Sequence, residues 1–352
     1  MQANVTAAGS GGRSLFERSP LHRLPDRVLQ WGLSGLAAFV LILIAYFFVR
    51  LIGQSSTAFS HIGVFDYFFR NNWDVAQLQQ GGACARGAGP CTLGALALVL
   101  GTLITSAIAL VIGVPIAVAS ALYVTELCPR RVRAPLALLV DLLAAVPSVV
   151  YGLWGVFVLI PHLKGFQQSL ANTFSFLPFV AGQVAGPSYF IGGLILAIMI
   201  LPIVSAIARE VIATVPQEHK EAALALGATR WEMIRTAVLP YSRAGITGGA
   251  MLGLGRAIGE TIAVVLVIGN SPTLAHSIFQ QGYTLAAVIA NEFGEAAATP
   301  VYRSALFAAG LALFVLTLFV NIIARRFVVS GDRGRRRAAA DVFAPEVVAG
   351  TE

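Results

Sequence analysis

An arginine and a glutamate stand inside a long apolar stretch of this 352-residue chain. Arg256 and Glu260 belong to the segment Leu252-Gly-Leu-Gly-Arg256-Ala-Ile-Gly-Glu260-Thr261, where a helix would place them on one face. Arg256 follows Arg243 by about 20 Å of helix at roughly 1.5 Å per residue. A charge at that depth in a bilayer costs about 2.5–3.5 kcal/mol or more. The pair therefore indicates either a lock between helices or a substrate path, and a guanidinium suits an oxyanion.

Composition sets the class of protein. Hydrophobic residues make up 57% of the chain and charged residues only 12%, and the mean hydropathy is +0.78. Several apolar stretches reach the roughly 20 residues that a helix needs to cross a bilayer, so an integral membrane protein is predicted. The net charge of +7 comes from residues beside these stretches and makes no basic face, which excludes a nucleic-acid-binding protein.

Six apolar stretches predict an all-α domain of six transmembrane helices at residues 29–329, between tails at 1–28 and 330–352. The predicted spans are 31–52, 93–122, 136–160, 190–213, 244–268 and 304–327. Lys and Arg concentrate in the two tails and in the segments after the second and fourth spans. This alternation predicts that both termini and the loop at 214–243 are cytoplasmic.

The loop between the fourth and fifth spans is charged and amphipathic. It predicts a helix over Gln217–Leu226, which Gly227 can end in a left-handed conformation. A second short helix, Arg230 to Ala237, is expected to lead to Pro240, which would set a turn into the fifth span. Small residues would leave one surface of the first helix smooth enough to enter a groove of another protein; these are Ala222, Ala223 and Ala225.

The loop between the first two spans contains five aromatic residues in Phe65-Asp-Tyr67-Phe68-Phe69-Arg-Asn-Asn-Trp73. This density favours a segment lying at the membrane interface over a docking surface for an external protein. Cys84 and Cys91 follow in the same loop, where an oxidising compartment would permit a disulfide between them, and two free thiols are the alternative. The sequence has no His/Cys metal cluster, GxxxxGK[ST] loop or nucleophile elbow, so neither a metal nor an enzymatic activity of its own is expected.

The loop after the fourth span resembles the EAA loop of ABC-importer permeases, with that family's spacing. The resemblance rests on Glu221, Ala222, Ala223, Gly227, Leu239 and Pro240. Ala237 departs from the pattern, because the family usually has an isoleucine there. In that family the loop forms coupling helices that dock into the ATPase subunit, so the resemblance implies this role for these residues.

Two further segments resemble the phosphate-specific subgroup of these permeases. They are Asp141-Leu-Leu-Ala-Ala-Val-Pro147-Ser148-Val-Val-Tyr-Gly152-Leu-Trp154-Gly155 and the segment at 252–261. The resemblance covers most of the chain between the first and last spans, without the tails and the cysteine-containing loop. It implies the type I ABC-importer permease fold and a role as the membrane subunit of an ATP-driven phosphate importer of the bacterial plasma (inner) membrane. Its implied partners are a homologous permease, a cytoplasmic ATPase dimer that carries ATP and Mg²⁺, and an external phosphate-binding protein.

Phosphate suits the charged pair of the fifth span. Monohydrogen phosphate keeps an O–H that the Glu260 carboxylate can accept, whereas sulfate has none. The carboxylate would also keep Arg256 from holding the anion too tightly, since a conduit must release its cargo. Arg256 and Glu260 are therefore expected to line the translocation path. Small residues on this helix are expected to let a second permease approach; these are Gly249, Gly253, Gly255 and Gly259.

Alternatives remain at this point. A permease for sulfate or molybdate is the nearest one, and a secondary transporter or a membrane subunit that signals phosphate supply are the others. A secondary transporter often shows two related halves with broken helices, and no such halves are apparent in the sequence. Asp141 and Glu210 are weaker site candidates, which we expect to be solvated charges at the ends of spans.

Overall fold

Helices account for the whole framework of the part of the chain that the computed structural model describes, residues 24–73, 75, 93–177, 179–182, 184–296 and 299–342. The α-helices are α1 Leu24–Ile62, α2 Val64–Phe69, α4 Leu96–Leu122, α5 Arg130–Leu143, α6 Ser148–Trp154, α7 Ile160–Thr173, α8 Tyr189–Ala213, α9 Gln217–Ala225, α10 Arg230–Met233, α11 Leu239–Gly259, α12 Ile262–Ile268, α13 Leu285–Ala296 and α14 Pro300–Val342. Three π-helical turns join some of them, η2 Tyr123–Leu127, η3 Gly155–Leu159 and η4 Ile234–Val238. Cys84 and Cys91 lie outside the described residues.

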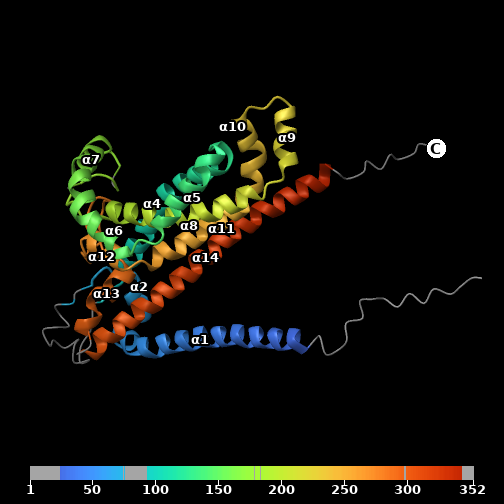
Figure 1. Ribbon diagram of the computed structural model, residues 1–352. Coiled ribbons are helices and arrows are strands. Elements are labelled where there is room, and N and C mark those ends of the chain that lie inside the picture. Colours follow the sequence, from blue (N-terminus) through green and yellow to red (C-terminus); the bar gives the residue numbers. More distant parts are fainter. Residues whose placement is uncertain are drawn as a thin grey trace, which may run out of the picture. The chain divides into compact units, whose positions relative to one another are not determined.

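The chain divides into two compact units, residues 1–50 and 51–352. Helix α1 begins in the first unit, and the second unit holds the other helices (Figure 1). Within the described residues, five helical segments are long and apolar enough to cross a membrane, and a bent pair makes a sixth if it counts as one span. The protein is therefore a multi-pass membrane protein, and the structure differs from the predicted spans at the third and the fifth.

The third span begins later than the sequence predicts. Helix α5 ends at Leu143, inside the predicted span at 136–160, and Pro147 then caps α6. From Ser148 the helical backbone continues to Thr173, and this run is the candidate span. The shift has a physical cause, because proline lacks the N–H that helix continuation needs and disfavours helical backbone in the preceding residue.

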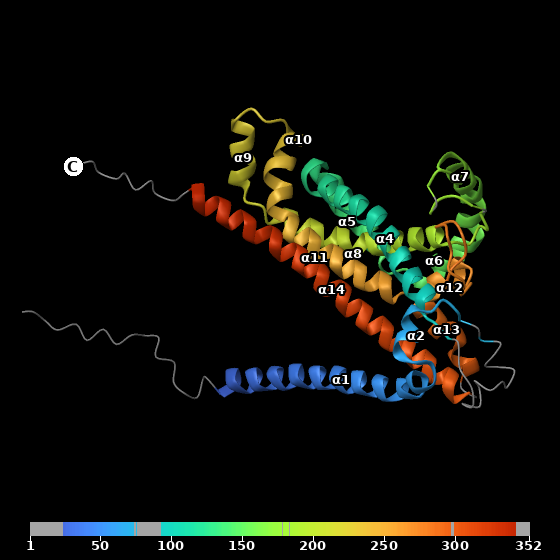
Figure 2. The same cartoon turned by 180° about the vertical axis from the view of Figure 1, so that it is seen from behind.

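Glycines let α4 and α8 pack closely in the core of the second unit. A Cβ atom on Gly193 of α8 would lie 2.5 Å from the Cβ atom of Ile108, and one on Gly113 of α4 would lie 3.0 Å from the carbonyl oxygen of Ala197. Neither distance leaves room for a side chain, so these positions require glycine for the observed packing. Helix α8 is mostly buried and packs on α11 as well as α4 (Figures 1 and 2). It is the central helix around which the site is built.

The aromatic stretch after α1 is pinned to the protein rather than only lying at a membrane interface. Tyr67 is fully buried, and its hydroxyl donates to the Ala305 carbonyl at 2.8 Å. The indole N–H of Trp73 donates to Glu292 Oε2 at 2.9 Å, and Tyr302 donates to the same oxygen at 2.7 Å. Two rings of the stretch remain exposed and stack on each other with centroids 4.4 Å apart; they are Phe65 and Phe69. The interfacial position is therefore wrong for the buried rings of the stretch, and for the two exposed rings it stays a prediction.

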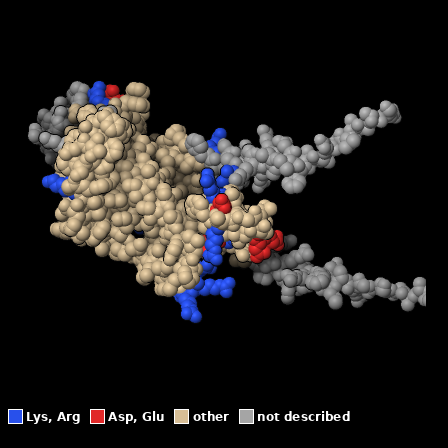
Figure 3. Space-filling view, turned by 90° about the horizontal axis from the view of Figure 1, so that it is seen from above, with Lys and Arg blue, Asp and Glu red and all other residues tan. Residues whose placement is uncertain are grey.

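Charged side chains gather at one end of the second unit. In Figure 3 the blue Lys and Arg atoms form a band beside a broad surface that is almost entirely tan. The band lies over the end that carries α5, α9 and α10, where Arg130, Arg131, Arg133, Arg230 and Arg235 are exposed. A charged end beside an apolar surface is what a protein surrounded by lipid requires.

Candidate functional site

The predicted fifth span is broken at the charged pair. Helix α11 ends at Gly259, Glu260 has extended backbone with φ −72° and ψ 130°, and α12 starts at Ile262. The two helices meet at a bend of 65°. A break frees backbone N–H and C=O groups, and inside a membrane this is tolerated only where protein or a water-filled cavity surrounds them. Broken helices at that depth commonly bind the substrates and ions of transporters.

Arg256 and Glu260 do not form an ion pair, although their spacing would allow one. Arg256 is exposed on the last turn of α11, whereas Glu260 is half-buried beyond the helix end. The ion pairs found among the described residues join Asp66 to Arg70, Asp141 to Arg209, and Glu126 to Lys220. None joins Arg256 to Glu260, so the arginine is not neutralised by that carboxylate and can take an external anion.

The structure adds Tyr151 of α6 to the neighbourhood of Arg256. The guanidinium lies close enough to act electrostatically on the phenol group, and the Tyr151 hydroxyl donates to the Leu143 carbonyl at 2.7 Å. Tyr151 is in the first turn of α6, whose N-terminus carries the positive end of the helix dipole. Sequence reasoning did not single out Tyr151, although it lies inside the segment at 141–155 that carries the family resemblance.

Helices α6 and α12 pack closely against each other. A Cβ atom on Gly152 of α6 would lie 2.6 Å from Leu266 Cδ1 and 3.1 Å from the Cα atom of Ala263, both on α12. Only glycine fits at that distance. The segment at 141–155 therefore packs against α12, which directly follows the segment at 252–261 in the chain. This contact is the main feature of the candidate site that sequence spacing could not supply.

The small residues of α11 divide between two faces of the helix. Gly249 and Gly253 face α8, because a Cβ atom there would lie 3.1 Å from Ile207 Cγ2 and 2.9 Å from Val204 Cγ2 respectively. Gly255 and Gly259 have open space where a Cβ atom would be. The expectation that all four serve contact with another subunit is wrong for the first pair, and it remains a prediction for the second.

The charged loop forms two short helices, as predicted. Gly227 has φ +87°, which confirms the left-handed end of α9. Thr229 and Glu232 make a capping box at the start of α10, with the Thr229 N–H donating to Glu232 Oε2 at 2.7 Å. The Thr229 hydroxyl lies 2.8 Å from the same carboxylate oxygen and donates to it. Both ends of the connection are therefore rigidly defined.

Leu239 and Pro240 do not form a turn, and this expectation is wrong. The backbone stays helical from Arg230 through Gly259, and Pro240 occupies the first turn of α11. The π-helical turn η4 immediately precedes it. A π-turn shifts the hydrogen-bond register, and proline is tolerated at a helix start because its missing N–H is not needed there. Motion of α10 would consequently reach α11 through continuous helix.

The surface of the charged loop is not the smooth alanine face that the sequence suggests. Ala223 is half-buried against an apolar cluster that includes Ala121, Ile212 and Met233, whereas Glu221 and Ala222 are exposed. Large apolar side chains are exposed instead, with Leu226 at 90% and Trp231 at 63% of their possible surface. Exposed large apolar side chains can mark a protein interface, and tryptophan is a frequent anchor there. The sequence already offered this signal, because Leu226 and Trp231 are large apolar residues in an otherwise charged segment around Gly227.

The two weaker site candidates, Asp141 and Glu210, have different surroundings. Asp141 of α5 accepts a hydrogen bond from Arg209 of α8 at 2.5 Å, so it is an ion-pair partner rather than a free end charge. Glu210 is exposed near the end of α8, as expected for a solvated charge. Among the described residues, no group of His, Cys, Asp and Glu could hold a metal ion.

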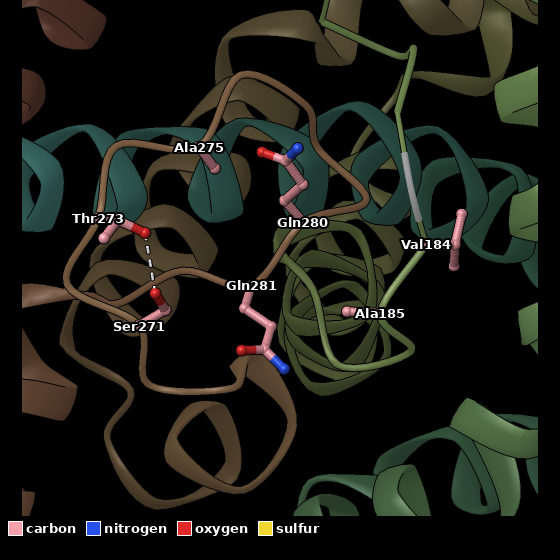
Figure 4. A pocket seen from close by; sticks show the side chains of 7 residues that line it. All are labelled: Val184, Ala185, Ser271, Thr273, Ala275, Gln280 and Gln281. Atoms are coloured by element: carbon pink, nitrogen blue, oxygen red, sulfur yellow. Dashed lines mark hydrogen bonds between the residues drawn. The ribbon is translucent and has the colours of Figure 1, made fainter.

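A polar pocket of about 320 Å³ opens at the end of the second unit opposite α9 and α10 (Figures 1 and 4). The segment before α8 and the segment after α12 form its walls; its lining is Val184, Ala185, Ser271, Thr273, Ala275, Gln280 and Gln281. The hydroxyls of Ser271 and Thr273 lie 2.9 Å apart, as the dashed line in Figure 4 marks. The pocket holds neutral hydroxyls and amides but no charge, so Arg256 is the better anion ligand.

The chain is similar to known proteins over most of its length. Residues 113–329 match the family described as binding-protein-dependent transport system inner membrane component. The chain belongs to that family of membrane permeases, and within it to the PstC group. A protein named phosphate transport system permease protein PstC, from Mesorhizobium japonicum, is 42% identical over 314 residues, which cover 88% of this chain and 91% of the relative.

A second relative carries the same name. The PstC protein of Xylella fastidiosa strain Temecula1 is 40% identical over 328 residues, covering 92% of this chain and 95% of its own. As a permease of this family, the chain is the non-catalytic inner-membrane component of a transport system. Among solved structures, the crystal structure of a bacterial ABC transporter involved in import of the acidic polysaccharide alginate has 20% identity and a TM-score of 0.48, covering 86% of this chain and 99% of its own.

Proposed function

We propose that this chain is the membrane permease subunit of an ATP-driven importer of inorganic phosphate and forms half of its translocation path. One observation carries the proposal: Arg256 stands unpaired with Glu260 at a helix break inside a candidate span, beside the first turn of α6. A guanidinium and the positive end of a helix together favour an oxyanion. Two relatives are named for phosphate transport, which favours phosphate over the other oxyanions.

The carboxylate at the break favours a protonated anion. Glu260 lies four residues from Arg256 in the chain and is half-buried. Its oxygen can accept the O–H of monohydrogen phosphate, whereas fully ionised sulfate would meet only repulsion. The same repulsion keeps binding weak enough for release. Arg256 would draw the anion in, and Glu260 would select the protonated species.

We further propose that the end carrying α9 and α10 faces the cytoplasm and meets an ATPase. Its exposed arginines fit the rule that places positive charge inside. Leu226 and Trp231 would be its anchors in the partner, and Glu221 and Ala222 would border them. The complete transporter would comprise a homologous permease of the PstA type, an ATPase dimer of the PstB type with ATP and Mg²⁺, and a phosphate-binding protein of the PstS type.

Uptake by the complete transporter in liposomes tests this function. We expect phosphate to accumulate only when ATP is inside the ATPase-facing compartment, and excess sulfate or molybdate to leave the rate nearly unchanged. Uptake that continues without ATP would show a secondary transporter instead. Equal competition by sulfate or molybdate would show a permease for a different oxyanion.

A further inference from the structure

An ion pair ties α9 to the end of α4. Lys220 Nζ and Glu126 Oε1 are 2.6 Å apart, and the two side chains are only 12% and 10% exposed. Of the ion pairs among the described residues, this is the one in which both partners are largely buried; the Arg70–Asp66 pair, by contrast, is about half exposed on both sides. Salt and water screen a buried pair little, so its geometry is held firmly.

The pair sits at a structurally unusual place. Glu126 belongs to η2, the π-helical turn that continues α4, and Lys220 directly precedes Glu221 in α9. Single π-turns occur mostly at functional positions in helices. Ala223 of α9 packs half-buried near Ala121 of α4 within one apolar cluster, so a charged contact and an apolar contact act side by side. Helix α9 therefore cannot shift without moving the end of α4 or breaking both contacts.

From η2 the polar contacts continue towards the membrane helices. Arg133 of α5 donates to the Thr125 carbonyl in η2 at 2.5 Å. Farther along α5, Asp141 pairs with Arg209 of α8 at 2.5 Å. At the end of α5, the Leu143 carbonyl accepts from Tyr151, the neighbour of Arg256. A displacement of η2 thus has a route of polar contacts through α5 to Tyr151, whose phenol feels the charge of Arg256.

We propose that Lys220 and Glu126 are positioning residues that form a strut between the coupling helix and the transmembrane helices. The strut converts movement of α9 into movement of α4 and α5, in parallel with the helical path from α10 to α11. This inference rests on the proposed function, because it needs an ATPase that moves α9. Without the pair, ATP hydrolysis would continue while transport falls, since α9 could move alone.

The test compares uptake with hydrolysis in the complete transporter. Lys220→Met and Glu126→Gln each remove one charge, and the exchange Lys220→Glu with Glu126→Lys restores the pair in reverse. We expect each single change to lower phosphate moved per ATP hydrolysed by about tenfold, the size of a typical coupling energy. The exchange should recover most of that ratio. Arg70→Gln, which breaks the exposed pair with Asp66, should leave the ratio unchanged.

The opposite results overturn the strut. If the assembled single variants keep the ratio of the unaltered protein, the pair does not couple the helices. If the single variants fail to assemble, the exchange decides: an assembled exchange variant with a low ratio contradicts the proposal, and one with a restored ratio supports it. Failure of the proposed function is distinguishable, because the unaltered transporter would then show no ATP-dependent phosphate uptake at all.

Discussion

Arg256 lies in the last turn of α11 and Glu260 caps the end of that helix, yet no ion pair joins the two side chains. This relationship changes what the two charges can do. Joined by an ion pair they would neutralise each other, as in a structural lock between helices. They lie around a break in the helix, with no ion pair between them. The arginine can therefore attract an anion, and the carboxylate can accept a hydrogen bond from an anion that is protonated.

Selectivity should depend on Glu260. Glu260→Gln removes the negative charge that repels fully ionised anions, while the amide keeps a similar shape. We expect sulfate to inhibit phosphate uptake about tenfold more strongly than in the unaltered protein, because loss of roughly 1.4 kcal/mol of repulsion has that effect. Competition uptake measures this. Glu210→Gln, at an exposed carboxylate near the end of α8, is the control and should show unchanged inhibition.

The proposed role of the exposed Leu226 in binding the ATPase can be tested apart from the fold. Leu226→Asp places a charge where 90% of the side chain is exposed, so the thermal stability of the isolated subunit should change by less than about 0.5 kcal/mol. Co-purification of the ATPase subunit should nevertheless be lost. Ala223→Leu is the counterpart, because that position packs against Met233 and its neighbours and the larger side chain should destabilise the subunit itself. Normal ATPase binding by Leu226→Asp would contradict the anchor.

The two glycine faces of α11 give a matched pair of substitutions. Gly253→Leu must displace Val204 Cγ2, which would lie only 2.9 Å from a Cβ atom at this position, and should destabilise the subunit by about 1–3 kcal/mol. Gly255→Leu meets open space and should leave the subunit stable. If the open face receives the second permease, Gly255→Leu should abolish co-purification of that subunit. Thermal unfolding and pull-down of the two variants separate these effects, and equal unfolding temperatures would contradict the division into faces.

Glu292 makes stability depend on pH. Burial raises the pKa of this carboxyl above its ordinary value, against the opposing effect of the hydrogen bonds from Trp73 and Tyr302. A carboxyl whose folded pKa is raised contributes stability that is fully present below its unfolded pKa and is lost as pH rises through the folded value. Unfolding temperature should therefore fall from pH 5 to pH 8 less steeply in Glu292→Gln than in the unaltered protein. Glu210→Gln is the control and should leave the slope of unfolding temperature against pH unchanged. The same slope in Glu292→Gln would contradict this prediction.

The sequence predicted the class of protein, the approximate spans and the two short helices of the charged loop, because apolar length and helix-end signals are local properties. It did not carry the break at Glu260, where no proline stands. Pro147 was a local signal for the late start at Ser148, but proline is also tolerated inside membrane helices, so the signal did not decide the position. The contact between Gly152 and α12 is equally invisible, because it joins segments about a hundred residues apart through a space that only glycine leaves. The expectation of a turn at Pro240 is wrong because the π-turn η4 accommodates proline within a helix.

The central claim is that Arg256 binds phosphate on its way through the membrane. The most direct measurement is phosphate uptake by Arg256→Gln in the complete transporter, at an amount of assembled complex equal to that of the unaltered protein. We expect a loss of about a hundredfold or more, since a charged donor to a bound anion contributes roughly 3 kcal/mol, and partial recovery in Arg256→Lys. Arg303 is an exposed arginine near the start of α14, and Arg303→Gln should transport phosphate normally. Unchanged uptake by Arg256→Gln would contradict the account.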